Sequence, residues 1–199
     1  MEPLEAPNQD VAAMLRLAEG DETAMDELME RHGERLFGYL LRSLQNEAEA
    51  NDIAQETFVK VYQHRLNFDF KSKFATWLYS IASNLVRDRY RWRVRHPQVS
   101  LDVANGPTGQ SLSDCLPDKQ PLPNEELELL ERAQAVKRAV AALPSELREP
   151  LILCEYEDFS HAQIGEILGC TPKSVEMRLY RARGLLRTRL AKWIDVLGS

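Results

Sequence analysis

The chain has 199 residues, of which 44% are hydrophobic, and a formal net charge of -6. That length fits one domain or two small ones, each with enough chain to bury a modest core. The three cysteines are widely spaced and form no Cys-x-x-Cys pair, which argues against a disulfide framework or a structural zinc site and favours a reducing, cytoplasmic setting. Because the apolar runs are far too short to span a bilayer, we expect no membrane insertion.

Charge is unevenly distributed along the chain. Residues 1–57 contain 14 acidic and 4 basic side chains, a balance of -10, whereas residues 173–192 have a balance of +6. A second basic segment, RDRYRWRVR at 87–95, has an arginine at every second position. Local charge decides what a surface attracts within about 8 Å at physiological salt. Each basic segment is therefore either a solvated helix face or a nucleic-acid surface.

Helical periodicity dominates the first half of the chain. Gly20 is expected to end a first helix and Asp21 to cap a second. A third helix is expected to begin at or near Asn51-Asp52, and a turn-prone stretch, NFDFKS, follows it. The polar face of this third helix contains Asp52, Gln55 and Glu56.

The segment FATWLYSIASNLVRDRYRWRVR at 74–95 predicts a fourth helix. Its apolar residues recur at i, i+3, i+4, i+7, i+8 and i+11, a spacing typical of a helix that faces a core. A β-strand would need an alternating apolar face, which this segment lacks. At about 100° per residue, the arginines form two stripes. These are Arg87/Arg91/Arg95 and Arg89/Arg93, and only one of them needs to follow a phosphate backbone.

Residues 96–123 predict a flexible linker, because they contain five prolines, two glycines and no sustained periodicity. Helical patterning returns at Asn124, which can serve as an N-cap, and continues to about Leu143. The predicted fold is therefore all-α, with two small helical domains joined by a flexible linker.

The segment from Phe159 to Leu190 predicts a helix-turn-helix. Ser160 can cap a short helix, Gly165 leaves room for a close helix crossing, and Gly169 supplies the turn. A second helix then starts at Thr171-Pro172, as N-cap and N1. Its inward side is predicted to contain Val175, Leu179, Ala182 and Leu186. Its outward side is predicted to contain Lys173, Ser174, Glu176, Met177, Arg178, Tyr180 and Arg181.

Such a helix can enter the major groove of DNA, where its N-terminal half meets base edges. Arg183, Arg187 and Arg189 lie farther along and are better placed for phosphate contacts. The alternative is an ordinary helical hairpin with a basic surface. The coincidence of caps, turn glycine and one-sided charge favours DNA binding.

A carboxylate metal site is the alternative to a solvated face for Asp52, Gln55 and Glu56. The chain has no Glu-x-x-His sequence, and its four histidines are scattered. It also lacks a phosphate-binding loop, a nucleophile elbow and a zinc motif. We therefore predict no catalytic residue, no metal and no cofactor.

Three segments, taken in order, resemble one family: the small extracytoplasmic-function (ECF) sigma factors of bacterial RNA polymerase. DIAQETFVKVY at 52–62 resembles the family's polymerase-binding helix, and residues 74–91 resemble its promoter-melting, minus-ten-reading helix. Residues 143–183 resemble its minus-thirty-five-reading domain. The resemblance implies a polymerase-binding and minus-ten domain at 1–95, a linker at 96–123 and a minus-thirty-five domain at 124–199.

The resemblance also implies a non-enzymatic subunit that directs promoter-specific initiation, with core RNA polymerase, promoter DNA and an anti-sigma factor as partners. Asp52, Gln55 and Glu56 would bind core polymerase. The implied minus-ten contacts are Phe68, Phe70, Lys71, Ser72, Asn84, Arg87 and Arg91. The loop and Asn84 would hold a flipped base, whose unstacking costs a few kcal/mol. The implied minus-thirty-five contacts are Lys173, Ser174, Glu176, Met177, Arg178, Tyr180, Arg181 and Arg183.

Two departures from the family pattern bear on promoter preference. The loop reads Phe68-Asp69-Phe70, where the family often has a Gly-containing Phe-Arg-Gly stretch. Glu176 and Met177 stand where relatives often carry Arg and a small polar residue. Because Glu accepts from cytosine N4 but repels phosphate, a different minus-thirty-five sequence is expected.

Two other interpretations compete with the sigma factor. A one-component regulator, with a ligand-sensing helical domain before the helix-turn-helix, would bind duplex operators without polymerase. It would need neither the DIAQETF face nor the basic segment at 87–95. A helical-bundle metalloenzyme would contain bound metal. Neither of these interpretations explains all three segments.

Overall fold

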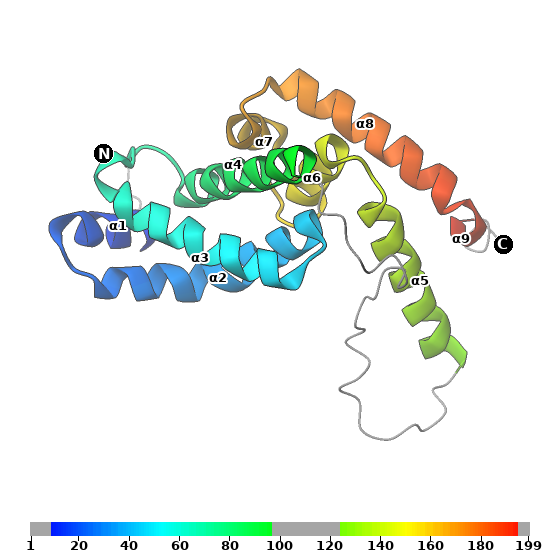
Figure 1. Ribbon diagram of the computed structural model, residues 1–199, viewed down its shortest axis with the longest axis horizontal. Helices are drawn as coiled ribbons and strands as arrows, with labels where there is room; N and C mark the ends of the chain where they lie inside the picture. Colours follow the sequence, from blue (N-terminus) through cyan, green and yellow to red (C-terminus); the bar gives the residue numbers. More distant parts are fainter. Residues whose placement is uncertain (1–8, 97–123, 195–199) are drawn as a thin grey trace, which may run out of the picture.

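The computed structural model describes residues 9–96 and 124–194, and every regular element in these ranges is helical (Figure 1). The first unit contains α1 (Gln9–Glu19), α2 (Thr23–Leu44), α3 (Glu47–Gln63), the 3-10 turn η1 (Arg65–Asn67) and α4 (Phe74–Arg95). The second unit contains α5 (Asn124–Ala141), α6 (Ser145–Glu155), α7 (His161–Leu168), α8 (Pro172–Arg189) and α9 (Ala191–Ile194). The all-α prediction with two helical units is confirmed. The predicted linker lies outside the described residues except for His96.

Local capping sets where the early helices begin. Gly20 has a φ of +102°, and the Asp21 carboxylate accepts from the Thr23 amide at 3.0 Å. The sequence predicts Asp21 as the cap of α2, but the residue directly before this helix is Glu22, whose side chain makes no capping bond. The third helix starts earlier than predicted, at Glu47 rather than near Asn51. Asn46 caps it by accepting from the Glu49 amide at 3.0 Å, and acidic residues in the first turn suit the helix dipole.

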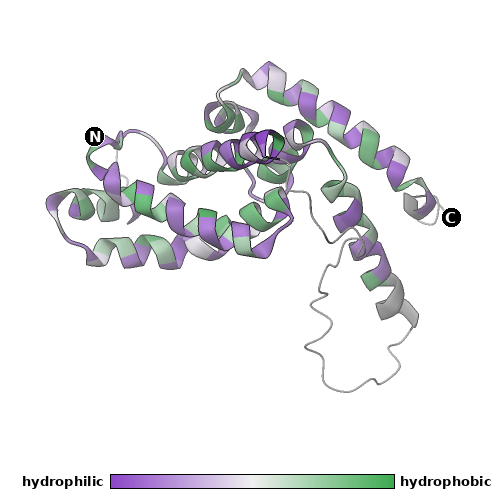
Figure 2. Cartoon of the chain, in the orientation of Figure 1, coloured by the Kyte–Doolittle hydropathy of each residue, from purple (hydrophilic) through white to green (hydrophobic). Residues whose placement is uncertain are grey.

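The first unit buries one face of each of its long helices. Met14 of α1, Leu28 and Tyr39 of α2, Ile53 of α3 and Phe74 of α4 are all 1% exposed or less. Burying an apolar side chain of this size contributes about 1.5–3 kcal/mol relative to leaving it exposed. This shared core fixes α4 against α2 and α3, and Figure 2 shows apolar residues, in green, along the helices of this unit.

The helix-turn-helix of the second unit has the predicted caps. The Ser160 side chain and Gln163 form a capping box at the start of α7, and Gly169 ends that helix with a φ of +65°. The Thr171 hydroxyl accepts from the Ser174 amide at 3.2 Å at the start of α8. A Cβ at Gly165 would lie 2.7 Å from the Cys170 carbonyl oxygen, so glycine is required for the crossing.

The two units lie against each other. α4 packs between α3 and α7, and α2 also contacts α6 (Figure 1). α8 extends across the outside of the second unit, while α5 projects away from the rest of it (Figure 1). Among the described helices, none is long and apolar enough to cross a membrane.

Candidate nucleic-acid and polymerase interfaces

The predicted polymerase-binding face lies on α3, opposite the side that packs into the core. Asp52, Gln55 and Glu56 are exposed, whereas Ile53 is buried. Val59 continues the same line at i+7 from Asp52 and is 52% exposed. Sequence analysis missed Val59. The sequence feature that could have identified it is an apolar residue on the polar face of an amphipathic helix.

The loop before α4 presents an aromatic pair of which only one ring reaches the surface. Phe68 is 3% exposed and packs against Trp77, with ring centroids 5.1 Å apart. Phe70 is 39% exposed and contacts Phe68 edge-on at 5.3 Å. The sequence predicts Phe68 as a minus-ten contact, but its burial makes it part of the core that supports the loop.

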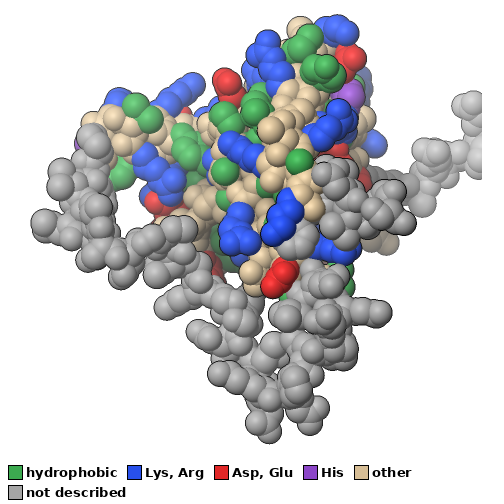
Figure 3. Space-filling view, turned by 90° about the vertical axis from the view of Figure 1, so that its right-hand side faces the viewer, with side chains coloured by type: hydrophobic (Ala, Val, Ile, Leu, Met, Phe, Trp, Pro, Cys, Tyr) green, Lys and Arg blue, Asp and Glu red, His purple; other side chains and the backbone are tan. Residues whose placement is uncertain are grey.

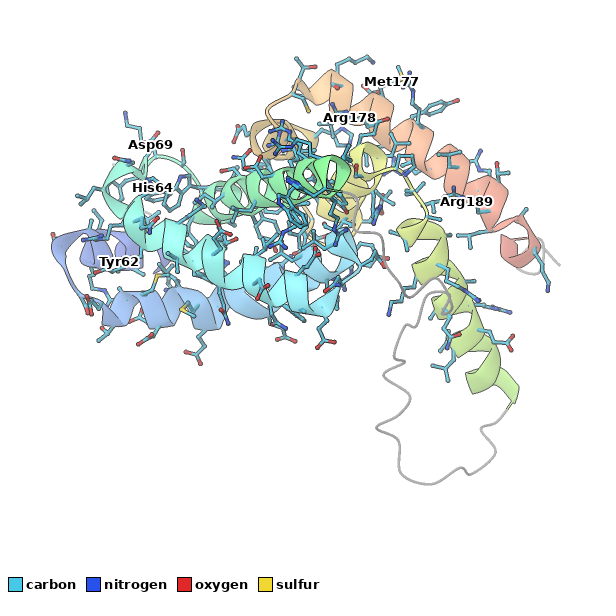
Figure 4. The ribbon with its side chains drawn as sticks, in the orientation of Figure 1. Tyr62, His64, Asp69, Met177, Arg178 and Arg189 are labelled. Carbon is cyan, nitrogen blue, oxygen red and sulfur yellow. The ribbon has the colours of Figure 1, made fainter. Side chains whose placement is uncertain are left out.

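The remaining loop residues form a tight turn. The Asp69 carboxylate accepts from the Lys71 amide at 3.0 Å, and its carbonyl accepts from the Ser72 amide at 2.8 Å. The side chains of Phe70, Lys71 and Ser72 are exposed beside it. Asp69 lies at the far end of the first unit in Figure 4, where the loop joins α4. This turn therefore offers one aromatic face with polar groups next to it.

The two arginine stripes of α4 have different surroundings. Arg93 forms an ion pair with Glu49 of α3 and lies 5.8 Å from the centroid of the Tyr90 ring. The Arg91 side chain is 69% exposed and forms an ion pair with Asp88 of the same helix at 3.2 Å. Arg95 is also exposed. Arg91 and Arg95 of the first stripe are therefore outward, whereas Arg93 of the second stripe faces α3.

Arg87 differs from the rest of its stripe. It donates to the Asn84 side-chain oxygen at 2.6 Å and to the Leu168 carbonyl of α7 at 3.4 Å. Asn84 itself is exposed, whereas Arg87 is half-buried. These two contacts hold the Arg87 guanidinium between Asn84 and α7, so fewer of its donors are available to a phosphate.

The outer face of α8 is largely open. Lys173, Glu176, Met177, Tyr180 and Arg181 are exposed, as predicted. Lys173 contacts Glu176 at 3.0 Å and, through this hydrogen bond and its charge, lowers the pKa of Glu176. Glu176 is therefore an anion at the N-terminal half of the helix.

Ser174 and Arg178 are less outward than predicted, since both are half-buried. They precede the buried Val175 and Leu179 by one position, so they flank the packed face of α8. Burial raises the pKa of Glu149 in α6, and the charge of Arg178 offsets part of that rise. In Figure 4, Met177 and Arg178 lie on neighbouring sides of α8.

Two of the arginines predicted for phosphate contact are engaged within the second unit. Arg183 forms an ion pair with Glu155 of α6 at 2.7 Å, which raises its pKa. Arg189 donates to the Ala139 carbonyl of α5 at 3.3 Å. Arg187 is exposed. Basic side chains, in blue, are spread over the end of the molecule seen in Figure 3, with few acidic ones among them.

The described residues do not offer a metal centre. Within residues 9–96 and 124–194, no group of three or more His, Cys, Asp or Glu side chains could hold a metal ion.

Comparison with known proteins gives the class of protein. Residues 28–96 match the family model of Sigma-70 region 2, and residues 133–186 match that of Sigma-70, region 4. The ECF RNA polymerase sigma factor SigW of Bacillus subtilis is 31% identical over 175 residues, covering 88% of this chain and 93% of the relative. The RNA polymerase sigma-H factor of Pseudomonas aeruginosa is 32% identical over 179 residues, covering 88% and 90%.

The solved structure of CnrH in complex with the cytosolic domain of CnrY is similar as well. It has a TM-score of 0.66 and 26% identity, and the match covers 93% of this chain and 99% of CnrH. The chain therefore belongs to the ECF sigma factors of bacterial RNA polymerase. It is a non-catalytic specificity subunit that directs promoter-specific transcription initiation. Region 2 reads the minus-ten element and region 4 reads the minus-thirty-five element.

Proposed function

We propose that core polymerase binds the α3 face formed by Asp52, Gln55, Glu56 and Val59. The observation that supports this is an exposed apolar side chain, Val59, in line with exposed polar ones on a helix whose opposite side is buried. Interface cores combine apolar contact with polar rims. The two carboxylates around Val59 suit a partner surface with positive charge.

The proposed minus-ten surface joins the loop before α4 to the outward stripe of that helix. Phe70 supplies a face on which an unstacked base can stack, and Asn84 supplies donors and an acceptor for a base edge. Lys71 and Ser72 lie beside this aromatic face, and Arg91 would bind a neighbouring phosphate. Arg87 would offer more donors to the same phosphates once it leaves the Leu168 carbonyl.

The proposed minus-thirty-five surface is the outer face of α8. Lys173, Glu176, Met177, Tyr180 and Arg181 would approach base edges and phosphates, with Ser174 and Arg178 at the margin. Arg183 would exchange Glu155 for a phosphate. Glu176 would set the specificity of this surface, because its carboxylate accepts a hydrogen bond from the cytosine N4 amino group and is repelled by phosphate.

The proposed division of the chain is 1–95 for polymerase and minus-ten binding, 96–123 as linker and 124–199 for minus-thirty-five binding. The location that suits a subunit of bacterial RNA polymerase is the cytoplasm. An anti-sigma partner is proposed because CnrH, which is similar to this chain over nearly its whole length, was solved in complex with CnrY.

The test is in vitro transcription with core polymerase from the source bacterium on a promoter library. Wild-type factor should bind core and select promoters with defined minus-ten and minus-thirty-five elements. Asn84→Ala should bind core normally and lose about tenfold in discrimination within the minus-ten element. Glu176→Gln should instead change the preferred minus-thirty-five sequence. Failure to bind core, with no promoter selected, would overturn the assignment.

A further inference from the structure

The interface between the two units contains buried polar contacts beside apolar ones. α2 and α4 form one side, while α6, α7 and the loop between them form the other. Two carboxylates of the second unit lie within it, with Glu149 at 9% and Glu157 at 6% exposure. Glu side chains are almost never this buried unless they have partners. Here the partners come from the first unit.

Glu149 is held by two hydroxyl groups of the first unit. Its Oε1 atom accepts from the Tyr39 hydroxyl of α2 at 2.8 Å and from the Ser83 hydroxyl of α4 at 2.5 Å. Burial raises the pKa of the Glu149 carboxyl and that of the Tyr39 phenol. One carboxylate thereby ties α6 to both long helices that face it.

Glu157 makes the corresponding contact nearer the other end of the interface. Its Oε2 atom accepts from the Tyr79 hydroxyl of α4 at 2.7 Å and lies 3.4 Å from Arg35 Nε of α2. The Tyr79 ring also packs against Phe159 of the second unit, with centroids 4.9 Å apart. Both carboxylates therefore depend on tyrosine hydroxyls of the other unit.

Arginines complete the interface at its margins. Arg148 of α6 donates to the Ser43 carbonyl at 3.0 Å, and Arg42 lies 4.5 Å from the centroid of the Tyr156 ring. Arg87 donates to the Leu168 carbonyl. As a result, α7 covers α4 around Arg87, within the surface proposed to meet minus-ten DNA.

This arrangement cannot persist when both promoter elements are bound. The elements are about 25 base pairs apart, or about 85 Å along B-DNA, and a duplex well below the persistence length stays nearly straight. Pro172, where α8 begins, is four residues from Leu168. The start of α8 therefore lies within about 20 Å of the Arg87 guanidinium. The two units have to separate before the factor can read both elements.

We propose that Glu149 and Glu157, with Tyr39, Ser83 and Tyr79, form an interdomain latch that holds the free factor in a closed state. In that state α7 engages Arg87 within the minus-ten surface, so this surface binds DNA less well than in the open state. Core polymerase or an open-state ligand releases it by binding the separated units better than the closed ones. The inference concerns the free factor and goes beyond the residue assignments above.

The chemistry of the latch makes it reversible. Separation returns both carboxylates and the three hydroxyls to water, which can satisfy all of them. In the closed state, removing one hydroxyl leaves a buried carboxylate short of a donor, whereas in the open state the same change costs little. Each removal should raise the open-to-closed ratio about tenfold.

The experiment uses the full-length free factor with Tyr39→Phe, Ser83→Ala and Tyr79→Phe, singly and combined. Small-angle X-ray scattering gives the radius of gyration, and anisotropy gives the affinity for a fluorescent, random-sequence single-stranded DNA pool. The combined variant should have a larger radius and at least about tenfold higher affinity, because the apparent affinity scales with the open fraction. Tyr62→Phe is the matched control, since Tyr62 donates to Glu22 within the first unit and should behave as wild type.

Far-UV circular dichroism checks that the variants keep their helices. Should the combined variant lose helicity, Arg35→Ala provides the test, because Arg35 is 58% exposed and its loss removes a contact of Glu157 without opening the core. It should enlarge the radius to a smaller degree. The latch would be overturned if the folded variants had the same radius of gyration as the wild type, whether that radius is compact or extended. A larger radius with unchanged DNA affinity would support the latch and overturn the minus-ten assignment of α4.

Discussion

α4 and α8 are both basic helices with one buried face, but they differ in how much of the other face is free. On α8 the outward residues stand clear of the first unit, and Tyr180 is 76% exposed. On α4 the arginines are shared between two neighbouring helices and solvent. Arg93 is bound to α3, Arg87 to α7, and only the C-terminal positions Arg91 and Arg95 are open.

This difference in free surface between α4 and α8 determines which promoter element the closed factor can read. The minus-thirty-five helix presents its outer face in the closed arrangement. On the minus-ten helix, Asn84 is exposed, whereas Arg87 is half-buried and donates to the Leu168 carbonyl of α7. Arg87 therefore becomes fully available only after α7 moves away. Duplex recognition by α8 and single-strand recognition by α4 should therefore respond differently to the same substitutions.

The largest expected effect comes from replacing a single glycine of the second unit. Gly165→Ala would place a Cβ 2.7 Å from the Cys170 carbonyl oxygen, a backbone atom that cannot easily move. We expect the free energy of unfolding of the second unit to fall by about 1–3 kcal/mol. Minus-thirty-five duplex binding should fall with it. Thermal unfolding followed by circular dichroism, together with duplex binding, measures both effects.

Gly184→Ala is the matched control for that substitution. Gly184 lies in α8, and a Cβ at this position would meet no atom of the neighbouring described residues within 4 Å, so alanine should stabilise the helix by up to about 1 kcal/mol. The two Gly→Ala changes should therefore shift the melting temperature in opposite directions. Equal shifts would mean that the crossing at Gly165 does not limit the packing of α7 on α8.

The next largest expected effect concerns one arginine from each stripe of α4. Arg91→Ala should weaken minus-ten single-strand binding by about 1 kcal/mol and lower the salt slope by about 1, as expected for a lost phosphate contact. Arg93→Ala should change the slope less, because Arg93 is bound to Glu49. It should instead loosen α4 from α3. Binding isotherms at several salt concentrations make the measurement, and a larger slope change for Arg93→Ala would reverse the assignment of the stripes.

Sequence analysis predicted the local features of both helices and missed their shared surroundings. Caps and turns were predictable at Ser160, Gly169 and Thr171 because each depends on residues only a few positions away. The start of α3 was misplaced because Asn46 supplied a cap that the apolar pattern did not require. Nothing local distinguishes Phe68, which is buried, from Phe70, which is exposed.

The interdomain contacts were beyond any periodicity argument. Tyr39 and Glu149 are 110 positions apart, and Tyr79 and Glu157 are 78 apart. From the sequence of α6 alone, Glu149 would be expected to be a solvent-exposed charged residue. Its burial depends on Tyr39 and Ser83 from the other unit, so only the tertiary arrangement identifies it as part of a latch.

The smallest expected effect is a pH dependence that bears on the closed state alone. The Glu149 carboxyl faces Tyr39 of α2, Ser83 and Arg87 of α4 and Arg178 of α8, next to Arg148 on its own helix. Burial raises its pKa in the closed state, while water would hydrate it in the open state. The closed state thus binds a proton more tightly, so it gains stability as pH falls and loses it as pH rises through the raised pKa.

Acidification should therefore favour the closed factor and reduce single-strand binding by wild type relative to Glu149→Gln. Gln keeps the oxygen acceptor for Tyr39 and Ser83 but does not titrate. We expect the affinity ratio of wild type to Glu149→Gln to fall by about threefold between about pH 7.5 and about pH 5.5. Using the ratio cancels the general rise in DNA affinity as other acidic groups are protonated. A ratio that stays constant over this range would show that Glu149 does not change its protonation between the closed and open states, and that pH leaves the covering of α4 by α7 unaffected.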